Sequence, residues 1–319
     1  MISPPAIEPR ARLDTWFRIG GGCARFAVPT SPDQLRLCLA IDPELRILGD
    51  GANLLVDDDG VDELVVSTAA LSRTEIDPAT GRVFALAGAK LQALAAETVR
   101  LGLAGLEGLA GVPASVGGAI IMNAGGRFGQ IADVVTSVHA LDRAGRDVIL
   151  ERAQIPFEYR ASGLSHLIVT AAELQLRPDD PAALRDRFKD VMAQKKLSQP
   201  LAANSAGCCF KNPLLRETLV VTGETLGLAS QRCPAGLLID RAGLKGLRVG
   251  GAAVSDRHAN FVVTDASATA RDVIDLMNLV VQRVHAEFGV TLHREVVVWS
   301  RREEAPLIET IAPRRSAGA

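Results

Sequence analysis

Hydrophobic positions recur with the period of an α-helix in several segments of the chain. The clearest begins after Thr269, where Asp272 completes a capping box and an apolar stripe runs over 273–288 until Gly289. We therefore predict a long amphipathic helix at this point. The same spacing predicts further helices over 31–39, 90–100 and 181–197, and a helical turn closed by glycine over 235–246.

Short apolar runs between turn residues predict the strands. They lie over 45–48, 54–56, 64–66, 83–87, 166–176 and 290–299, and a hairpin is expected over 134–150. By the period of two, the last strand would place His293 and Glu295 on one face. Because Glu295 precedes three valines, its carboxyl group is a candidate for a shifted pKa.

The two ends of the chain lack this periodicity. Residues 1–14 are expected to be a flexible leader, and 301–319, which mixes Pro, Arg, Ser and Gly, a frayed tail. Between them we expect one module over 15–197, in two parts that meet near residue 66, and a second domain over 198–300, with Pro200 at the boundary.

Composition describes an ordinary globular protein, with 48% hydrophobic and 23% charged residues. A formal charge of -2 gives no general reason to expect nucleic acid or an anionic membrane as partner. No apolar run approaches the roughly 20 residues of a membrane span. Five cysteines without disulfide-framework or zinc spacing indicate a reducing compartment, so we expect a cytoplasmic protein without a metal site.

A glycine turn over 49–53 lies between two predicted strands. Glycine allows successive N–H groups to converge on an anion, which favours a phosphate ligand. Because the turn leads into a strand and not a helix, the Rossmann and P-loop motifs are excluded. A plain hairpin turn remains the alternative.

Eight glycines fall between residues 102 and 126. Glycine costs backbone entropy on folding, so we interpret this stretch as a wall where backbone lies close against a large planar cofactor. The alternative is a glycine-rich packing segment between strands.

A segment rich in reactive side chains covers residues 204–213. Small residues there precede Cys208, Cys209, Lys211 and Asn212, which is a suitable composition for a reactive turn. A surface loop with incidental cysteines is the alternative.

Seven segments, in order along residues 15–299, together resemble the UDP-N-acetylenolpyruvoylglucosamine reductases. They are GDGANLLV at 49–56, the glycine-rich stretch at 102–125, Tyr159 to Ser162, SAGCCFKNP at 205–213, LIDRAGLKG at 238–246, GGAAVSDRHANF at 250–261 and the Glu295-Val296 pair. The resemblance is to the shorter subgroup of the family, which lacks a tyrosine-bearing insertion.

This resemblance implies the fold and the cofactors. The fold class would be α+β, with a two-part FAD-binding module of the vanillyl-alcohol-oxidase type followed by an α+β substrate-binding domain. FAD and NADPH would be the cofactors. The residues expected at FAD are Gly49, Asp50, Gly51, Ala52, Asn53, Leu54, Gly111, Pro113, Ser115, Val116, Gly117, Gly118, Asn123, Ala124, Gly125 and Ile131.

The resemblance also implies the reaction. Hydride from NADPH would pass by way of the flavin to the enolpyruvyl group of a UDP-sugar, in peptidoglycan precursor synthesis. Arg160 and Glu295 would stabilise the enolate-like charge, and Cys208 would return the proton. The substrate contacts would be Tyr159, Lys196 or its neighbour Lys195, Lys211 and Asn212. We expect a monomer that binds only small molecules.

The main departure from the family is Cys208, where serine is usual. A protonated thiol is a stronger acid than a hydroxyl, so we expect activity to be retained. Cys209 is interpreted as a packing residue. Ala52 and Arg127 also depart from the common residues, which affects fine ligand contacts.

Two other functions are compatible with part of this pattern. A flavin oxidase of the same cofactor fold would often carry a histidine or cysteine for covalent FAD attachment, and residues 102–126 contain neither. A catalytically impaired homologue would bind FAD and UDP-sugar without turnover. Retention of Arg160, Lys211, Asn212 and Glu295 favours the reductase over that alternative.

Overall fold

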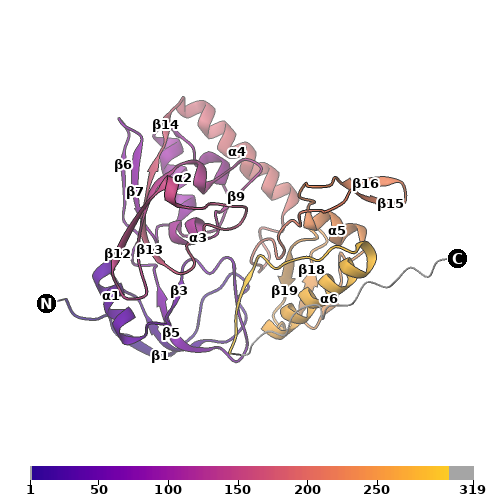
Figure 1. Cartoon of the computed structure of the whole chain (residues 1–319), viewed down its shortest axis with the longest axis horizontal. Helices are drawn as coiled ribbons and strands as arrows, with labels where there is room; N and C mark the ends of the chain where they lie inside the picture. The colour runs from indigo at the N-terminus through magenta and orange to yellow at the C-terminus, as the bar shows by residue number, and fades with distance from the viewer. Residues whose placement is uncertain (1, 302–319) are drawn as a thin grey trace.

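The structure, a computed structural model, describes residues 2–301 and has two lobes. Figure 1 shows the larger lobe built around two sheets and the smaller one around helix α6, with α4 running from the first lobe toward the second. The tail predicted over 301–319 lies outside the described residues except for Arg301.

The first sheet has the strand order β1-β2-β5-β3. Its strands are β1 (Ile7–Ala11), β2 (Cys23–Ala27), β5 (Val61–Ser67) and β3 (Arg46–Leu48). β5 runs parallel to both β2 and β3, and helix α1 (Pro32–Ile41) connects β2 with β3. Ser31 caps α1 by accepting a hydrogen bond from Gln34 N, and the buried Leu35 and Leu39 pack on Leu64 and Val66 of β5.

The prediction of a flexible leader was wrong over residues 7–11, which form strand β1. β1 pairs antiparallel with β2 at the edge of the first sheet, and Leu13 just after it is buried. The strand escaped prediction because only the last of its five side chains is buried. Its stability comes from backbone pairing with a strand distant in sequence, which leaves no hydrophobic pattern.

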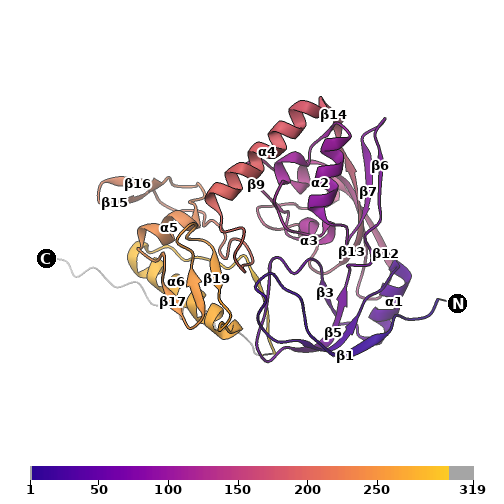
Figure 2. The ribbon, with the colours of Figure 1, turned by 180° about the vertical axis from the view of Figure 1, so that it is seen from behind.

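The second sheet is antiparallel, with the order β12-β11-β13-β7-β6. Its strands are β12 (Asp147–Glu151), β11 (Val135–Leu141), β13 (Ile168–Gln175), β7 (Arg82–Leu86) and β6 (Thr74–Asp77). Three helices pack against this sheet and its hydrophobic core: α2 (Leu91–Arg100), α3 (Val116–Ile121) and α4 (Pro181–Ser198). Figure 2 shows all three on the same side of β7 and β13.

Short pairings complete the first lobe. β8 (Leu103–Ala104) pairs with β14 (Arg177–Pro178), and β9 (Gly125–Gly126) pairs with β10 (Gly129–Gln130). The 3-10 turns cover Glu107–Leu109, Ile131–Asp133 and Arg152–Gln154.

The second lobe packs helices on a small sheet of order β17-β18-β19. Its elements are the hairpin β15 (Leu219–Val221) and β16 (Glu224–Gly227), α5 (Ala235–Arg241), β17 (Arg248–Val249), β18 (Ala252–Val254), β19 (Val262–Thr264) and α6 (Ala270–Phe288). The capping box of Thr269 and Asp272 is confirmed, and Gly289 ends α6 in the left-handed conformation with φ 66°.

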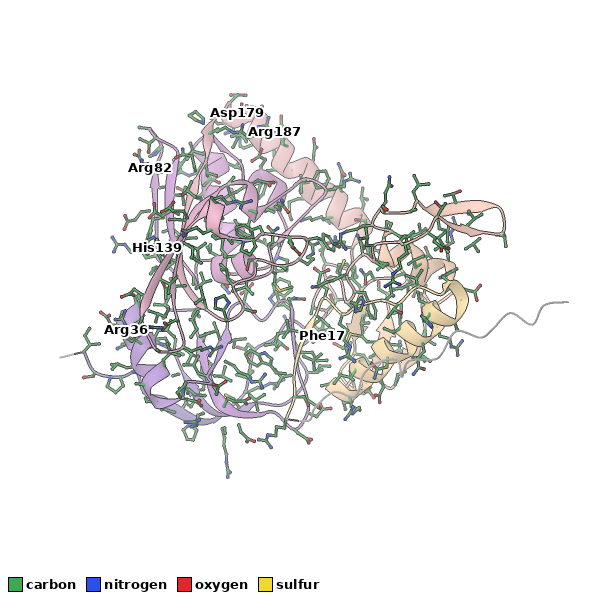
Figure 3. The ribbon with its side chains drawn as sticks, in the orientation of Figure 1. Phe17, Arg36, Arg82, His139, Asp179 and Arg187 are labelled. Atoms are coloured by element: carbon green, nitrogen blue, oxygen red, sulfur yellow. The ribbon has the colours of Figure 1, made fainter. Side chains whose placement is uncertain are left out.

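Residues of the first lobe contact the second lobe at Phe17 and at Asp58. Phe17, fully buried, lies in the core of the second lobe, where its carbonyl accepts a hydrogen bond from Thr264 Oγ1 at 3.0 Å; Figure 3 places it at the boundary between the lobes. The Asp58 carboxylate accepts hydrogen bonds from Ala270 N at 2.9 Å and Arg271 N at 3.0 Å, at the start of α6. Residues far upstream therefore complete the second lobe.

The last segment of the chain returns to the first lobe. Strand β20 (Val297–Trp299) pairs parallel with β4 (Leu54–Val56). The strand predicted over 290–299 was therefore too long. The prediction that His293 and Glu295 share one face was also wrong, because His293 is exposed while Glu295 is largely buried. Residues 290–296 instead follow the 208–211 segment through isolated backbone contacts such as Glu295 N to Cys209 O, at 2.7 Å.

None of the helices between residues 2 and 301 has the length and apolar character needed to cross a membrane.

Candidate active site

A cavity of about 1240 Å³ lies between the two lobes. Its walls bring together segments that are far apart in sequence: the 49–54 turn, the glycine-rich stretch, and residues of the second lobe. Most of the predicted site residues line it. They are Gly49, Asp50, Gly51, Ala52, Asn53, Leu54, Gly111, Pro113, Ser115, Gly117, Gly118, Ala124, Gly125, Arg160, Cys208, Asn212 and Glu295.

The 49–53 turn is not a hairpin, because β3 before it and β4 after it belong to different sheets. Gly51 adopts a positive φ of 64°, and its carbonyl accepts a hydrogen bond from Trp16 N at 3.1 Å. Asp50 forms an ion pair with Lys90, at the start of α2. The alternative of a plain hairpin turn is thus removed.

The glycine turn and the start of α3 meet on one wall. A Cβ placed on Gly49 would lie 2.6 Å from Ser115 Oγ, so a larger residue at this position would displace the Ser115 side chain. Ser115 caps α3 by accepting a hydrogen bond from Gly118 N at 3.2 Å. The 49–54 turn and the start of α3 therefore border the same part of the cavity.

These walls fit FAD. The cavity has a volume of about 1240 Å³, many glycines line it, and the 49–54 turn borders it, which suits a large planar cofactor with a pyrophosphate. Gly111, with φ 70°, lies so close to Met192 that an added Cβ would approach Met192 Sδ to 2.8 Å. A larger side chain at Gly49 or Gly111 would displace its neighbours.

Arg160 and Glu295 form an ion pair inside the cavity. Arg160 Nε lies 2.5 Å from Glu295 Oε1, and their side chains are 19% and 13% exposed. Burial raises the pKa of Glu295 above its ordinary value, while Arg160 and Lys211 act in the opposite direction. Arg160 has a φ of 57°, a conformation that costs free energy for a residue other than glycine and is often found at functional sites.

Cys208 lines the same cavity and is protonated at neutral pH. Burial, followed by the charge of Glu295, raises the pKa of its thiol to about 12. The Arg160 charge and a hydrogen bond with the Asn260 side chain oppose this rise. Cys209 is fully buried in the core of the second lobe, where it packs as expected.

The Asn260 side chain fixes the backbone next to Cys208. Its Oδ1 accepts a hydrogen bond from Phe210 N at 3.0 Å, and its Nδ2 donates to Phe210 O at 2.9 Å. The backbone carbonyl of Asn260 also accepts from Cys209 N at 2.8 Å. Because Asn260 is buried, these bonds hold the reactive segment rigidly.

Tyr159 and Asn212 lie next to each other at the edge of the site. Asn212 N donates to Tyr159 Oη at 3.2 Å, and the Tyr159 ring lies between the guanidinium groups of Arg160 and Arg232, at 5.2 and 4.1 Å from its centre. Asn212 Oδ1 accepts from Ala235 N at 2.9 Å. Lys211 is half-buried and close enough to influence the pKa of Glu295.

Lys195, and not Lys196, lines the cavity. Lys195 Nζ donates to Ala110 O at 2.6 Å, and burial together with the Arg160 charge lowers its pKa to about 8. Lys196 is exposed on the outer side of α4. Adjacent residues of a helix are turned by about 100°, so Lys195 and Lys196 point in different directions.

Three residues expected at FAD lie behind the cavity wall. Val116 and Ile131 are fully buried in the core of the first lobe. Asn123, also buried, donates to Glu158 O at 2.9 Å and accepts from Ala132 N at 3.3 Å. These side chains support the glycine-rich wall, so any contact with a cofactor would use backbone atoms.

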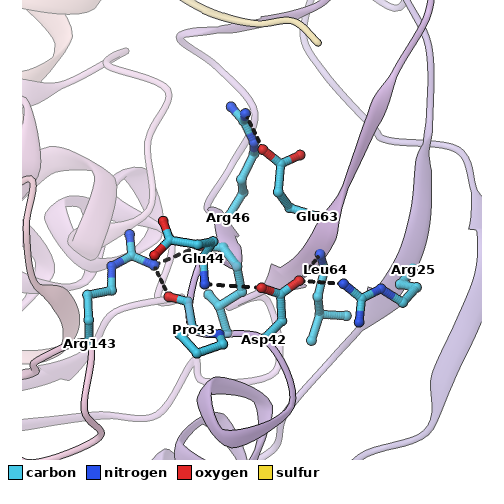
Figure 4. Close-up of polar contacts among 9 residues, drawn as sticks. Arg25, Asp42, Pro43, Glu44, Arg46, Glu63, Leu64 and Arg143 are labelled. Carbon is cyan, nitrogen blue, oxygen red and sulfur yellow. Dashed lines mark hydrogen bonds and ion pairs between the residues drawn. The ribbon is translucent and has the colours of Figure 1, made fainter.

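Other lining residues were not predicted as site residues. Among them are Gln199, His258 and, at the far end of the cavity, Glu44, Arg46 and Arg143. Figure 4 shows Arg143 donating to Pro43 O and Leu45 O, at 3.2 and 2.8 Å, and Arg46 paired with Glu63 at 2.6 Å. Arg143 lies in a hairpin turn of the second sheet, so only folding places it beside the first sheet.

The sequence matches two known families over most of its length. Residues 24–150 match the FAD binding domain, and residues 199–299 match the UDP-N-acetylenolpyruvoylglucosamine reductase, C-terminal domain.

Full-length relatives carry the same name. The UDP-N-acetylenolpyruvoylglucosamine reductase of Moorella thermoacetica is 40% identical over 298 residues, which covers 92% of each chain. That of Syntrophobacter fumaroxidans is 37% identical over 306 residues, covering 92% of this chain and 83% of the relative. The solved structure of the Thermus caldophilus enzyme matches with a TM-score of 0.74 and 37% identity, over 90% of this chain and 96% of the other.

The fold and the site define a flavoprotein oxidoreductase, in which an FAD-binding module is followed by an α+β domain and a buried ion pair faces the cavity between them. Within that class, the chain belongs to the UDP-N-acetylenolpyruvoylglucosamine reductase family. The predicted fold class, family and FAD cofactor are confirmed.

Proposed function

We propose that the protein reduces the enolpyruvyl group of UDP-N-acetylglucosamine enolpyruvate to the lactyl group of UDP-N-acetylmuramate, with NADPH as the reductant. One observation carries the proposal: Arg160, Glu295 and Cys208 line one cavity with the glycine-rich walls. A buried cation, a buried carboxyl group and a protonated thiol are the groups that reduction of a conjugated double bond requires.

FAD, held by the 49–54 turn and by the wall formed by Gly111, Pro113, Ser115, Gly117 and Gly118, would supply the hydride after reduction by NADPH. The turn suits the pyrophosphate, because its N–H groups border the cavity and Asp50 is already neutralised by Lys90. The backbone wall suits the planar ring.

Arg160 and Glu295 would stabilise the charge that develops on the substrate. When hydride adds to the terminal vinyl carbon, negative charge accumulates on the neighbouring carbon and its carboxylate. Arg160 offers a fixed positive charge there, and a protonated Glu295 offers a hydrogen-bond donor, consistent with its raised pKa. Arg160 lines the cavity and has a left-handed backbone conformation, which is often found at functional sites.

Cys208 would donate the proton that completes the reduction. The S–H bond breaks, a C–H bond forms at the carbon next to the carboxylate, and the thiolate left behind recovers a proton from solvent. Its pKa of about 12 keeps the thiol loaded at neutral pH. Glu295 and Cys208 are held together because Glu295 N donates to Cys209 O at 2.7 Å.

The sugar nucleotide would bind on the second-lobe side of the cavity. Lys195 would meet the diphosphate, and Tyr159, Lys211 and Asn212 would contact the substrate beside it. In this proposal Lys196 makes no contact with the substrate. We propose further that the enzyme acts as a monomer in the cytoplasm and binds no nucleic acid.

The decisive test is anaerobic stopped-flow at the flavin absorbance band. Protein reduced by NADPH is mixed with the enolpyruvyl UDP-sugar, and flavin reoxidation that depends on this sugar, with one lactyl product per flavin, is the expected result. Reduced flavin that persists in the presence of bound sugar would point to a binding protein without turnover. If reduced protein mixed with aerated buffer, without the sugar, is reoxidised as fast as by the sugar, the protein is an oxidase.

A further inference from the structure

The side chain of Asn53 spans from the glycine turn to the catalytic carboxyl segment. Asn53 Nδ2 donates to Glu295 O at 3.0 Å, and Asn53 O accepts from Val297 N at 3.0 Å. Asn53 therefore holds the two residues on either side of Val296, namely Glu295 and Val297. The strand pair β4 and β20 begins directly after this contact, with Leu54 opposite Val297.

The other side of Glu295 is fixed by the reactive segment. Glu295 N donates to Cys209 O at 2.7 Å, and Cys209 is the neighbour of Cys208. The backbone of Glu295 is thus held between the Cys208–Cys209 segment and Asn53. Its own side chain remains available for Arg160.

The turn that carries Asn53 is itself fixed to the first lobe. Gly51 O accepts from Trp16 N at 3.1 Å, and Asp50 pairs with Lys90. A shift of the turn would be passed to Glu295 through two hydrogen bonds, because both bonds are made by one residue with little freedom. Misplacement of a catalytic group by about 1 Å can cost about 100-fold in rate.

We propose that Asn53 is a positioning residue that couples the cofactor turn to the placement of Glu295. Its side chain acts on the reaction through Glu295 and not by contact with the reacting atoms. This inference rests on the proposed function, since it assigns Glu295 a part in the reduction of the enolpyruvyl group. It predicts that loss of the Asn53 donor slows the step that uses Glu295 and leaves reduction of the flavin by NADPH nearly unchanged.

Two substitutions distinguish the effect of the Asn53 hydrogen-bond donor from the effect of its side-chain volume. Asn53→Ala removes both, whereas Asn53→Asp keeps the size and places an acceptor opposite the Glu295 carbonyl. If the hydrogen bond matters, Asn53→Asp is at least as slow as Asn53→Ala. If the residue only fills space, Asn53→Ala is the slower of the two, which would overturn the proposal.

The test measures each half-reaction by stopped-flow and the FAD dissociation constant by quenching of flavin fluorescence. We expect reoxidation by the enolpyruvyl sugar to slow by about 10- to 100-fold, with flavin reduction and FAD affinity each within about threefold of the wild type. A parallel loss of FAD affinity, or equal slowing of both half-reactions, would contradict the proposal. Wild-type protein that is not reoxidised by the sugar would instead refute the proposed function itself.

A double-mutant cycle with Glu295→Gln provides the second measurement. If Asn53 acts through Glu295, Asn53→Ala slows reoxidation by less than about threefold in the Glu295→Gln background, and the two effects are not additive. Multiplicative effects would show that Asn53 acts independently. Should Asn53→Ala fail to fold, Asn53→Ser, which is polar and smaller than asparagine, takes its place in the cycle.

Discussion

Arg160 Nε lies 2.5 Å from Glu295 Oε1, although one residue belongs to the first lobe and the other approaches from the second. The pair lines the cavity between the lobes, and it joins a cation to a carboxyl group whose pKa burial raises. The ion pair therefore depends on both lobes being in place. Most of the predictions below test this arrangement.

Substitution of either partner of the pair should slow the reduction of the enolpyruvyl group. We expect Glu295→Gln to lower kcat by about 100- to 1000-fold, the usual cost of removing one group that stabilises developing charge. Arg160→Lys should also lower kcat, because an ammonium group cannot reproduce the geometry of the guanidinium. Steady-state kinetics with the enolpyruvyl sugar measure both. A change confined to KM would contradict this role for the pair.

Cys208→Ser should keep measurable turnover, whereas Cys208→Ala should lower kcat by about 100-fold or more, because only the first retains a proton donor. The rate of product formation, monitored as NADPH oxidation, checks this. Equal rates for Cys208→Ala and the wild type would exclude the thiol as the acid.

The Cys208 thiol should resist alkylation at neutral pH. Its pKa of about 12 leaves almost no thiolate at pH 7.5, and thiolate is the reactive form. Iodoacetamide followed by mass spectrometry of the folded protein measures the modified fraction, with the urea-unfolded protein as control. Rapid modification of the folded protein at Cys208 would contradict the raised pKa.

Substrate capture should weaken at alkaline pH. The pKa of Lys195 is lowered to about 8 by burial and by Arg160, so the side chain is charged at pH 7 and mostly neutral at pH 9. Loss of the positive charge removes attraction for a diphosphate, so kcat/KM for the sugar nucleotide should fall as pH rises through about 8. Lys195→Arg should shift this fall to higher pH, and the exposed Lys196→Arg provides the matched control. An unchanged profile in Lys195→Arg would assign the titration to another group.

Asp58→Ala should lower the free energy of unfolding by about 0.5–2 kcal/mol, the range found for lost helix N-terminal caps. Its carboxylate satisfies Ala270 N and Arg271 N at the start of α6, and Thr269 alone would not replace both bonds. Urea titration of the FAD-loaded protein measures the change. Asp275→Ala, on the exposed face of α6, removes the same charge without this contact and should lie within about 0.5 kcal/mol of the wild type.

Local signals identified most elements and several site residues. The capping box at Thr269 and Asp272 and the apolar stripe of α6 are visible in the sequence because a helix satisfies its own backbone and repeats its buried face regularly. The glycines at 49–51 and 111–118 were also informative, since few other residues permit such close backbone approach. Family resemblance then connected these segments with FAD, Arg160, Cys208 and Glu295.

Only the tertiary structure decided the contacts between segments distant in sequence. It paired β1 with β2, placed Phe17 in the core of the second lobe, placed Lys195 at the cavity, and joined Asn53 to Glu295. The sequence by itself determined the local elements and the family, because propensity, capping and glycine act over a few residues. Pairings across the chain depend on which surfaces meet after folding, and that information lies in packing and not in any local pattern.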